Sequence, residues 1–195
     1  MDIEVRKRGE QVMRVILICM IVALCSAISG YVDVEDPPFV GRVIYDEAAF
    51  EVNGHVFTLG YDTLQDMVDA GVVFEAEDVP STLGHNESAS YKLKLSDSQY
   101  AQVSVLNEAN ENDATAACTL SQLYYPVDLQ SKQEVLKLNF PLTITEEELV
   151  ASAGDPTVKN VNMGVTHYMY TVGKYGYDFI FANGTLSAVT LSYAR

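Results

Sequence analysis

The fold is decided by two stretches of equal length, EVNGHVFTLGYDTLQDMVDAG at residues 51–71 and EVLKLNFPLTITEEELVASAG at residues 134–154. Matching residues recur at a constant offset of 83: Glu51-Val52 and Glu134-Val135, Phe57 and Phe140, Leu59 and Leu142, Ala70-Gly71 and Ala153-Gly154. A recurrence of this kind indicates that one structural unit has been duplicated within the chain. The sequence therefore predicts two copies of one unit, which concerns architecture and leaves the activity open.

Each stretch carries the signals of a short helix. Asp62 with Gln65, and Thr145 with Glu148, have the three-residue spacing of helix caps, in which side chains satisfy unpaired backbone N–H groups. The glycines that follow favour termination of both helices, so we expect helices over residues 63–70 and 145–153. The apolar residues expected to be buried are Leu64, Met67 and Val68 in the first helix and Leu149, Val150 and Ala153 in the second.

Alternating apolar residues and turn signals predict the strands. Asn53-Gly54 favours a tight hairpin within residues 49–59, and residues 135–142 form the matching strand of the second copy. The remaining expected strands form two three-stranded meanders, over 91–95, 100–106 and 119–125, and over 168–172, 177–182 and 186–193. The predicted fold class is α+β, with two repeated strand-helix-three-strand units that contain antiparallel meanders.

The first 27 residues have the composition of a signal peptide. Basic residues at 6–8 and 14 precede an apolar run at 15–24, and small residues around Ala27 offer a cleavage site. We expect residues 28–44 to be a linker, followed by repeat units at 45–126 and 127–195. Two alternatives stay open: residues 15–32 are retained as a membrane anchor, or Cys25 is lipidated.

The chain is strongly acidic, with a formal net charge of −15. Without residues 1–27 it keeps 8 Lys/Arg and 24 Asp/Glu, a formal charge of −16. Such a field repels phosphate backbones and anionic lipids. We therefore expect no nucleic-acid partner, and membrane attachment only through an uncleaved anchor or a lipidated Cys25. The charge favours a basic protein surface or a neutral glycan as the partner.

The sequence offers little catalytic chemistry. His55, His85 and His167 have no ligand spacing and no carboxylate beside them in the sequence. Cys118 lies among apolar residues, which is typical of a small buried side chain. The acidic loop at 107–113 lacks the spacing of a calcium site. No catalytic residue, metal site or cofactor is predicted, although a site assembled from distant carboxylates leaves no local signature.

Tyrosine is unusually abundant, because the chain has twelve tyrosines and no tryptophan. Matching positions of the two copies indicate packing for four of them, which are Tyr91, Tyr100, Tyr168 and Tyr177. Two neighbouring tyrosines on a strand must face opposite sides, and a tyrosine in a turn at 173–176 is expected to be exposed. The offset between copies falls from 83 at the helices to 66 at the third strands, so the first copy carries inserted loops, where binding sites concentrate. The candidate binding residues are Tyr124, Tyr125, Tyr175, Asn107, Glu111 and Asp113.

The order of helix, Gly-x-Pro and a Tyr- and Phe-rich meander that closes on Asn183-Gly184-Thr185-Leu186 resembles the units of the β-lactamase inhibitor protein-like fold. It is also similar to small bacterial envelope lipoproteins built on related units. The resemblance covers residues 134–193 well and 49–125 more loosely, and this chain shows a strand and one helix where those families have a helix pair. It implies an exported protein that works by binding another protein.

We therefore expect a secreted or surface-attached protein of a bacterial envelope that acts as a non-enzymatic protein-binding module. The alternative is a hydrolase or carbohydrate-active domain with a site between the two units, and a third interpretation is a structural spacer. An exposed sheet face that carries tyrosine, methionine and phenylalanine would favour the binding module. A cavity lined by two carboxylates, or by a histidine and a carboxylate, would favour the enzyme.

Overall fold

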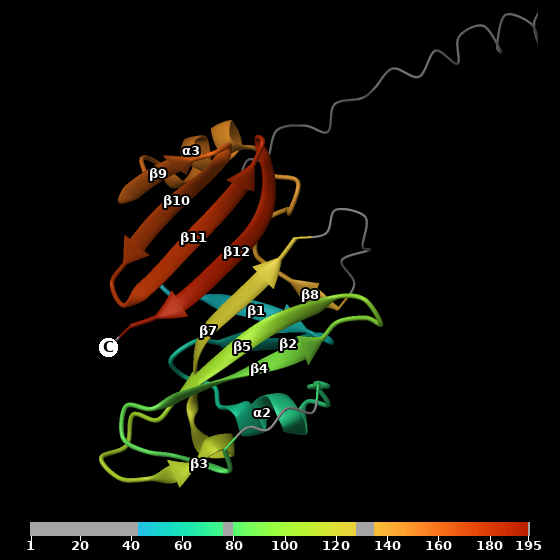
Figure 1. The fold of residues 1–195 in the computed structure, drawn as a ribbon, viewed down its shortest axis with the longest axis vertical. Helices are drawn as coiled ribbons and strands as arrows, with labels where there is room; N and C mark the ends of the chain where they lie inside the picture. Colours follow the sequence, from blue (N-terminus) through green and yellow to red (C-terminus); the bar gives the residue numbers. More distant parts are fainter. Residues whose placement is uncertain (1–42, 76–79, 128–134, 195) are drawn as a thin grey trace, which may run out of the picture. The chain divides into compact units, whose positions relative to one another are not determined.

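A computed structural model of the chain describes residues 43–75, 80–127 and 135–194 (Figure 1). All of the described residues belong to a single compact unit. The predicted signal peptide and almost all of the predicted linker therefore lie outside the described residues. Neither α-helix in the described ranges is long and apolar enough to cross a membrane.

The described residues are mostly β-structure. The strands are β1 (Ala49–Val52), β2 (His55–Thr58), β3 (Thr82–Leu83), β4 (Ser88–Lys94), β5 (Tyr100–Leu106), β6 (Asp113–Ala114), β7 (Thr119–Pro126), β8 (Leu136–Lys137), β9 (Val158–Asn162), β10 (Val165–Val172), β11 (Tyr175–Ala182) and β12 (Thr185–Tyr193). The helices are α2 (Leu64–Asp69), the single 3-10 turn η1 (Thr115–Ala117) and α3 (Glu146–Ala153).

The predicted fold class, α+β with repeated strand-helix-three-strand units, is wrong. The described part of the chain has 12 strands in three antiparallel sheets, and its two short α-helices and one 3-10 turn make it only 12% helical. The strands form a seven-stranded sheet in the order β4-β5-β7-β12-β11-β10-β9, a three-stranded sheet in the order β2-β1-β8, and a two-stranded sheet of β3 and β6. The helices are too short to form a layer of their own.

The two meanders join into one sheet through their last strands. β7 and β12 pair antiparallel from Pro126 opposite Ala188 to Gln122 opposite Ser192. The strands β1 and β8 also meet, because Val52 of β1 lies opposite Leu136 of β8. Each join removes exposed sheet edges and lets the two meanders share one core, which a three-stranded meander could not enclose alone.

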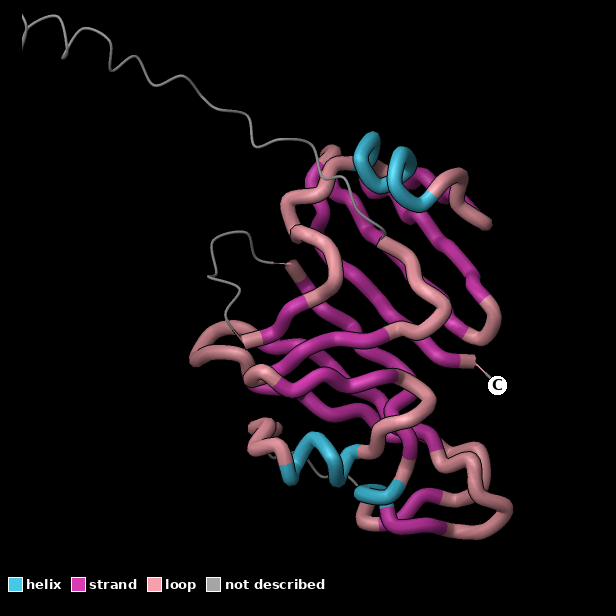
Figure 2. Tube along the Cα trace, turned by 180° about the vertical axis from the view of Figure 1, so that it is seen from behind, coloured by secondary structure: helices cyan, strands magenta, loops and turns pink. Residues whose placement is uncertain are grey.

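The core lies between the seven-stranded sheet and the three-stranded sheet with α2 and α3, which Figure 2 shows from behind. The rings of Phe140 and Phe179 lie 5.1 Å apart, and Met67 of α2 and Leu149 of α3 are fully buried. The hydroxyl of Tyr177 donates to the carbonyl oxygen of Tyr45 at 3.0 Å, so the start of the described chain is tied to β11. Cys118 is buried, as predicted.

Turns and caps follow the sequence closely. Asn53-Gly54 and Asn183-Gly184 adopt positive φ angles and close tight hairpins, as predicted. Thr145 and Glu148 form the expected capping box of α3. In α2 the capping box is one residue further along than predicted, because Thr63 and Asp66 form it while the carboxylate of Asp62 accepts a hydrogen bond from the Thr58 N–H at 2.6 Å.

Three local predictions differ from the structure. The strand expected over 135–142 is reduced to Leu136–Lys137, because the chain turns at 139–143 around Pro141. Val68, expected to be buried with Leu64 and Met67, is 49% exposed, since α2 is short and packs through a narrow face. The strand β9, which follows Asp155-Pro156, has no counterpart in the prediction.

Candidate functional site

One face of the seven-stranded sheet is turned away from the core. Along β11 the side chains alternate between buried and half-buried, with Tyr177 and Phe179 in the core and Asp178 and Ile180 on the opposite side. We call this opposite side the outer face. Most of its side chains are half-buried or exposed in the described part of the chain, as is usual for an antiparallel sheet with one solvated side.

A row of seven side chains crosses the outer face from one edge of the sheet to the other. Each residue of the row lies directly opposite the next on the neighbouring strand. In the order of the strands the row is Lys92, Gln102, Tyr124, Thr190, Asp178, Met169 and Val158. Residues opposite each other on adjacent strands have Cβ atoms roughly 5 Å apart, so the row is a continuous surface.

Tyr124 is the aromatic residue of this row. Its side chain is 39% exposed, and its neighbours across the sheet are Gln102 on β5 and Thr190 on β12. Gln122 lies two residues earlier on the same strand and shares the same face. A tyrosine surrounded by amide and hydroxyl groups offers a ring for apolar contact and several uncharged donors and acceptors. This combination is common where proteins recognise one another.

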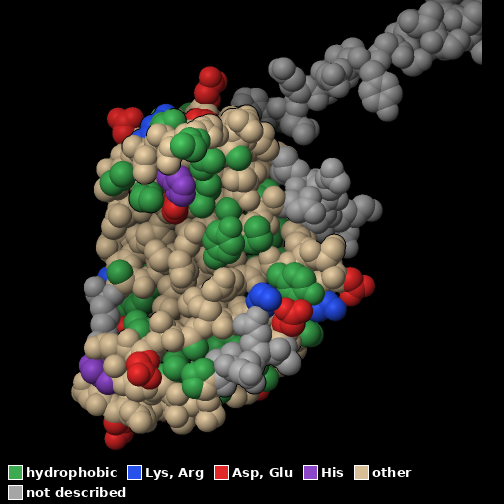
Figure 3. Space-filling model, viewed as in Figure 1, with side chains coloured by type: hydrophobic (Ala, Val, Ile, Leu, Met, Phe, Trp, Pro, Cys, Tyr) green, Lys and Arg blue, Asp and Glu red, His purple; other side chains and the backbone are tan. Residues whose placement is uncertain are grey.

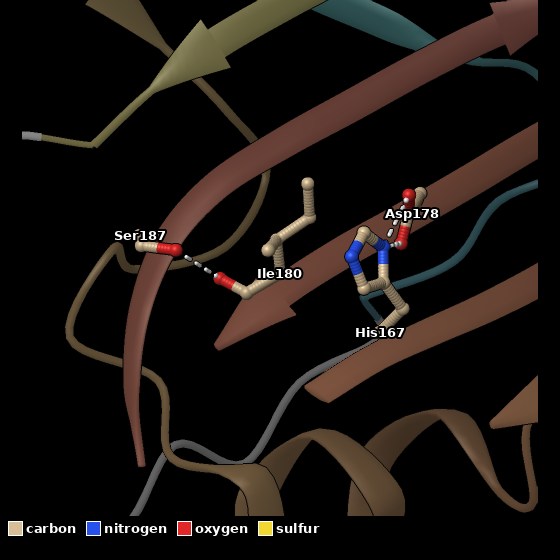
Figure 4. Close-up of polar contacts among 4 residues, drawn as sticks. All are labelled: His167, Asp178, Ile180 and Ser187. Atoms are coloured by element: carbon tan, nitrogen blue, oxygen red, sulfur yellow. Dashed lines mark hydrogen bonds and ion pairs between the residues drawn. The ribbon is translucent and has the colours of Figure 1, made fainter. Parts of the chain in front are cut away.

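The β10–β11 part of the face carries a histidine paired with a carboxylate (Figure 4). The Nδ1 atom of His167 lies 3.1 Å and 3.2 Å from the two carboxylate oxygens of Asp178. Both side chains are partly exposed, at 32% and 23%. Met169 and Val158, 36% and 50% exposed, add apolar surface beside the pair.

The histidine–carboxylate pair is one of the signals that would favour an enzyme. In hydrolases such a pair activates a nearby hydroxyl or thiol nucleophile. Ser187, the hydroxyl drawn in Figure 4, instead donates to the carbonyl oxygen of Ile180 at 2.9 Å, and Ile180 lies between it and His167. The pair also stands on an open sheet face, where water reaches both groups. The arrangement therefore suits binding better than covalent catalysis.

Charges on the outer face are largely neutralised. Lys92 pairs with Glu75 at 3.3 Å, and Lys94 pairs with Asp97 at 3.0 Å. Asp178 of the row faces the ring of His167. In Figure 3 the acidic side chains gather mainly at the margins of the view, and hydrophobic and uncharged atoms fill the middle. The chain thus carries a net charge of −15 around a face that is close to neutral.

The structure separates the three candidate tyrosines. Tyr124 faces outward, whereas Tyr125 is 1% exposed and its hydroxyl accepts a hydrogen bond from Gln99 at 2.9 Å. Tyr175, predicted to be exposed in a turn, is 6% exposed, because the turn is Gly173-Lys174 and Tyr175 is already the first residue of β11. Burial raises the pKa of Tyr175 to about 12. Of the three tyrosines, Tyr124 is the one placed to contact a partner.

The loop residues serve the fold rather than the outer face. Asn107 is 2% exposed, and its side-chain amide donates to the carbonyl oxygens of Leu83 and Glu111, both at 2.8 Å. The carboxylate of Asp113 accepts a hydrogen bond from the next N–H of β6 at 2.8 Å. Glu111 is exposed and lies in the loop between β5 and β6, outside the strands of the outer face. No group of three potential metal ligands occurs among the described residues.

Several residues of the outer face were not identified from the sequence. His167 and Asp178 are eleven residues apart, yet the short turn at Gly173-Lys174 brings them diagonally together on neighbouring strands. Counting outward from that turn would have found the pair. The neighbours of Tyr124 could not be found in this way, because Gln102 and Thr190 reach it through pairings between distant strands.

Comparisons with known proteins give little further information. No protein-family model matches the chain, and no curated protein matches it. A solved structure of a DUF4309 family protein (YjgB) from Bacillus subtilis subsp. subtilis str. 168 is similar, with 18% identity and a TM-score of 0.41. The match covers 70% of this chain and 81% of that protein. A similarity this distant carries no argument about activity.

Proposed function

We propose that the chain is an exported, non-enzymatic binding module of a bacterial envelope, and that it holds a protein partner on the outer face. The observation that carries this proposal is the seven-residue row with the exposed ring of Tyr124. This surface carries an exposed tyrosine ring and almost no unpaired charge. A partner can therefore cover it without burying an unpaired charge. The resemblance to envelope binding proteins and the signal-peptide composition of residues 1–27 agree with it.

The near-neutral face also bears on the kind of partner. Contacts there come from a tyrosine ring, amides, hydroxyls and a methionine, so the complementary surface should be apolar and polar without strong charge. The remaining acidic surface excludes anionic partners by repulsion. Binding at the face itself should depend weakly on salt, because Lys92 and Lys94 are already paired with carboxylates.

A matched pair of variants tests the proposal. Tyr124→Ala removes the exposed ring from the row, whereas Val56→Ala removes a comparably exposed apolar side chain, 66% exposed, from β2 in the other sheet. Capture of a defined envelope protein by the chain should fall at least about tenfold with Tyr124→Ala and stay unchanged with Val56→Ala. Equal capture by both variants would show that Tyr124 is not part of the binding surface.

The hydrolase alternative rests on the pair of His167 and Asp178. If the pair acts as a general base, His167→Gln should abolish turnover of ester or glycoside substrates while leaving the fold intact. If the face only binds, purified chain turns over none of them, and His167→Gln changes affinity by less than Tyr124→Ala does. Retained turnover in the variant would assign any observed hydrolysis to a contaminant.

A further inference from the structure

The two edge strands of the seven-stranded sheet, β4 and β9, differ in what lies beside them. At β4 the chain segment 73–75 lies alongside the edge, where the Glu75 N–H donates to Lys92 and the Lys94 N–H donates to Val73, both at 2.9 Å. At the other edge, β9 pairs with β10 on one side, and in the described part of the chain no strand pairs with its other side. All five residues of β9 are exposed.

The register identifies which backbone groups of β9 are unpaired. Asn162 and Val165 flank the two-residue turn Met163-Gly164, so they form the hydrogen-bonded pair that closes the hairpin. Such pairs alternate along an antiparallel ladder, so Asn160 also directs its N–H and C=O toward β10. Lys159 and Val161 direct theirs away from the sheet. Four backbone groups are therefore presented to a further strand.

The side chains around this edge do little to prevent pairing. Natural edge strands are commonly protected by a lysine that projects into solvent. Here the Nζ atom of Lys159 is held by the hydroxyl of Tyr168 at 2.7 Å, and that hydroxyl donates to Glu146 at 2.5 Å. Val158 and Val161, 50% and 64% exposed, are left as the most apolar groups of the strand.

The turn after β9 adds a second observation. Met163 has a φ angle of +47°, a region in which the other non-glycine residues of the described chain are all asparagines: Asn53, Asn86 and Asn183. Asparagine tolerates this conformation, whereas a methionine is strained by it. The Met163 side chain is 98% exposed, so packing within the described fold does not compensate the strain. An apolar residue at a strained, exposed position beside an open edge indicates a contact outside the described fold.

We propose that β9 pairs antiparallel with β9 of a second copy of this chain, with Asn160 opposite Asn160. A two-fold axis requires that if one residue faces another, the reverse also holds. In this register Lys159 and Val161, which carry the outward backbone groups, face each other across the axis and make four hydrogen bonds. No lysine then faces a lysine, and the stem of Lys159 covers Val161 of the second copy.

The identity of the occupant follows from this self-complementarity. Val158 lies opposite Asn162 of the second copy on the outer-face side, and Asn160 lies opposite its own equivalent, where two amides can hydrogen-bond. Met163 reaches the Val158 end of the second copy's strand. A pairing of five residues is small, and two chains of net charge −15 repel each other, so the dimer should be weak and should strengthen as salt is added.

Engineered cysteines on β9 test the register of this pairing directly. In this register Asn160 and its equivalent form a non-hydrogen-bonded pair, with Cα atoms about 4.5 Å apart, which a disulfide can span. Asn162 and its equivalent would be more than about 10 Å apart. In a full-length chain with Cys19→Ser and Cys25→Ser, Asn160→Cys should form a 160–160 disulfide under mild oxidation, identified by peptide mapping. Asn162→Cys, the matched control, should form at least about tenfold less.

A second test uses a backbone change that spares the hairpin. The Val161 N–H points away from β10, so Val161→Pro removes two of the four hydrogen bonds between the copies without removing one from the β9–β10 ladder. Sedimentation should show an association constant lowered at least about tenfold relative to Val161→Ala, which keeps the N–H. The proposal fails if Asn160→Cys links no better than Asn162→Cys. It also fails if folded Val161→Pro associates as strongly as Val161→Ala.

Discussion

Tyr124 of β7 lies directly opposite Thr190 of β12, in the pairing that joins the two meanders into one sheet. Both side chains are on the outer face, and Tyr124 is the aromatic residue of the row that crosses it. The join therefore does two things. It closes the core on one side, and it places the exposed ring of Tyr124 at the boundary between the two meanders.

The neighbouring tyrosines should behave in opposite ways. Tyr125→Ala removes a ring that is 1% exposed and leaves a cavity, so we expect it to lower the free energy of unfolding by about 3–5 kcal/mol. Tyr124→Ala, at a 39% exposed position, should change it by less than about 1 kcal/mol. Urea unfolding of both variants checks this, and a larger loss for Tyr124→Ala than for Tyr125→Ala would mean that the strand faces the other way.

The helix α2 offers a second contrast between adjacent residues. Met67 is fully buried, so Met67→Asp places an unpaired carboxylate in the core and should cost several kcal/mol or prevent folding. Val68 is 49% exposed, and Val68→Asp should stay within about 0.5 kcal/mol of the parent chain. Thermal melting distinguishes the two, and a melting temperature unaffected by Met67→Asp would show that α2 is placed wrongly.

The strained turn at Met163 predicts a stabilising substitution. Met163→Asn should raise the free energy of unfolding by about 0.5–1 kcal/mol, because asparagine adopts a positive φ angle with less strain. Asn183→Met, in the corresponding turn between β11 and β12, is the reverse control and should lower it by a similar amount. No gain from Met163→Asn, together with no loss from Asn183→Met, would show that these turns are not under strain.

Alkaline pH should destabilise the fold through its buried tyrosines. Burial raises the pKa of Tyr170 to about 12 and that of Tyr175 to about 12. In the unfolded chain these hydroxyls lose their protons near pH 10, so the folded state holds more protons between about pH 10 and 12. Their contribution to stability is complete below pH 10 and is lost as the pH rises through this window.

The variant Tyr170→Phe tests that assignment. It should flatten the fall in the free energy of unfolding above pH 10, and Tyr124→Phe at the exposed position serves as the control. An absorbance titration follows the same groups, since Tyr170 and Tyr175 should ionise only at the alkaline end. Equal slopes for Tyr170→Phe and the parent chain would contradict the account of the buried hydroxyl.

Local sequence signals predicted the parts of the fold that depend on neighbouring residues. The Asn-Gly turns, the capping box at Thr145 and the alternation along β10 and β11 each involve residues a few positions apart. β9 was missed because its turn carries Met163 where asparagine is usual, and because Val158 and Val161 do not alternate with period two. Tyr175 was placed outside because the turn before it was expected to be longer.

The remaining features depend on distant pairings that leave no local trace. The edge-to-edge join of β7 and β12 brings Tyr124 and Thr190 together across 66 residues of sequence, and the pairing of Val52 with Leu136 spans 84. Duplication indicated two similar units but not that their sheets would merge. The predicted α+β class was therefore wrong. The outer face could not be predicted either, because its residues are brought together only by the strand order of the sheet.

Site-specific photo-crosslinking at position 124 tests the central claim most directly. A photoreactive phenylalanine analogue replaces Tyr124 in the full chain in its own cells, and the same analogue at Val56, an exposed position of β2, is the control. The account predicts a discrete protein adduct at position 124 that is absent at position 56. Adducts of equal yield at both positions, or none at position 124 while the chain is folded and exported, would contradict a protein-binding outer face.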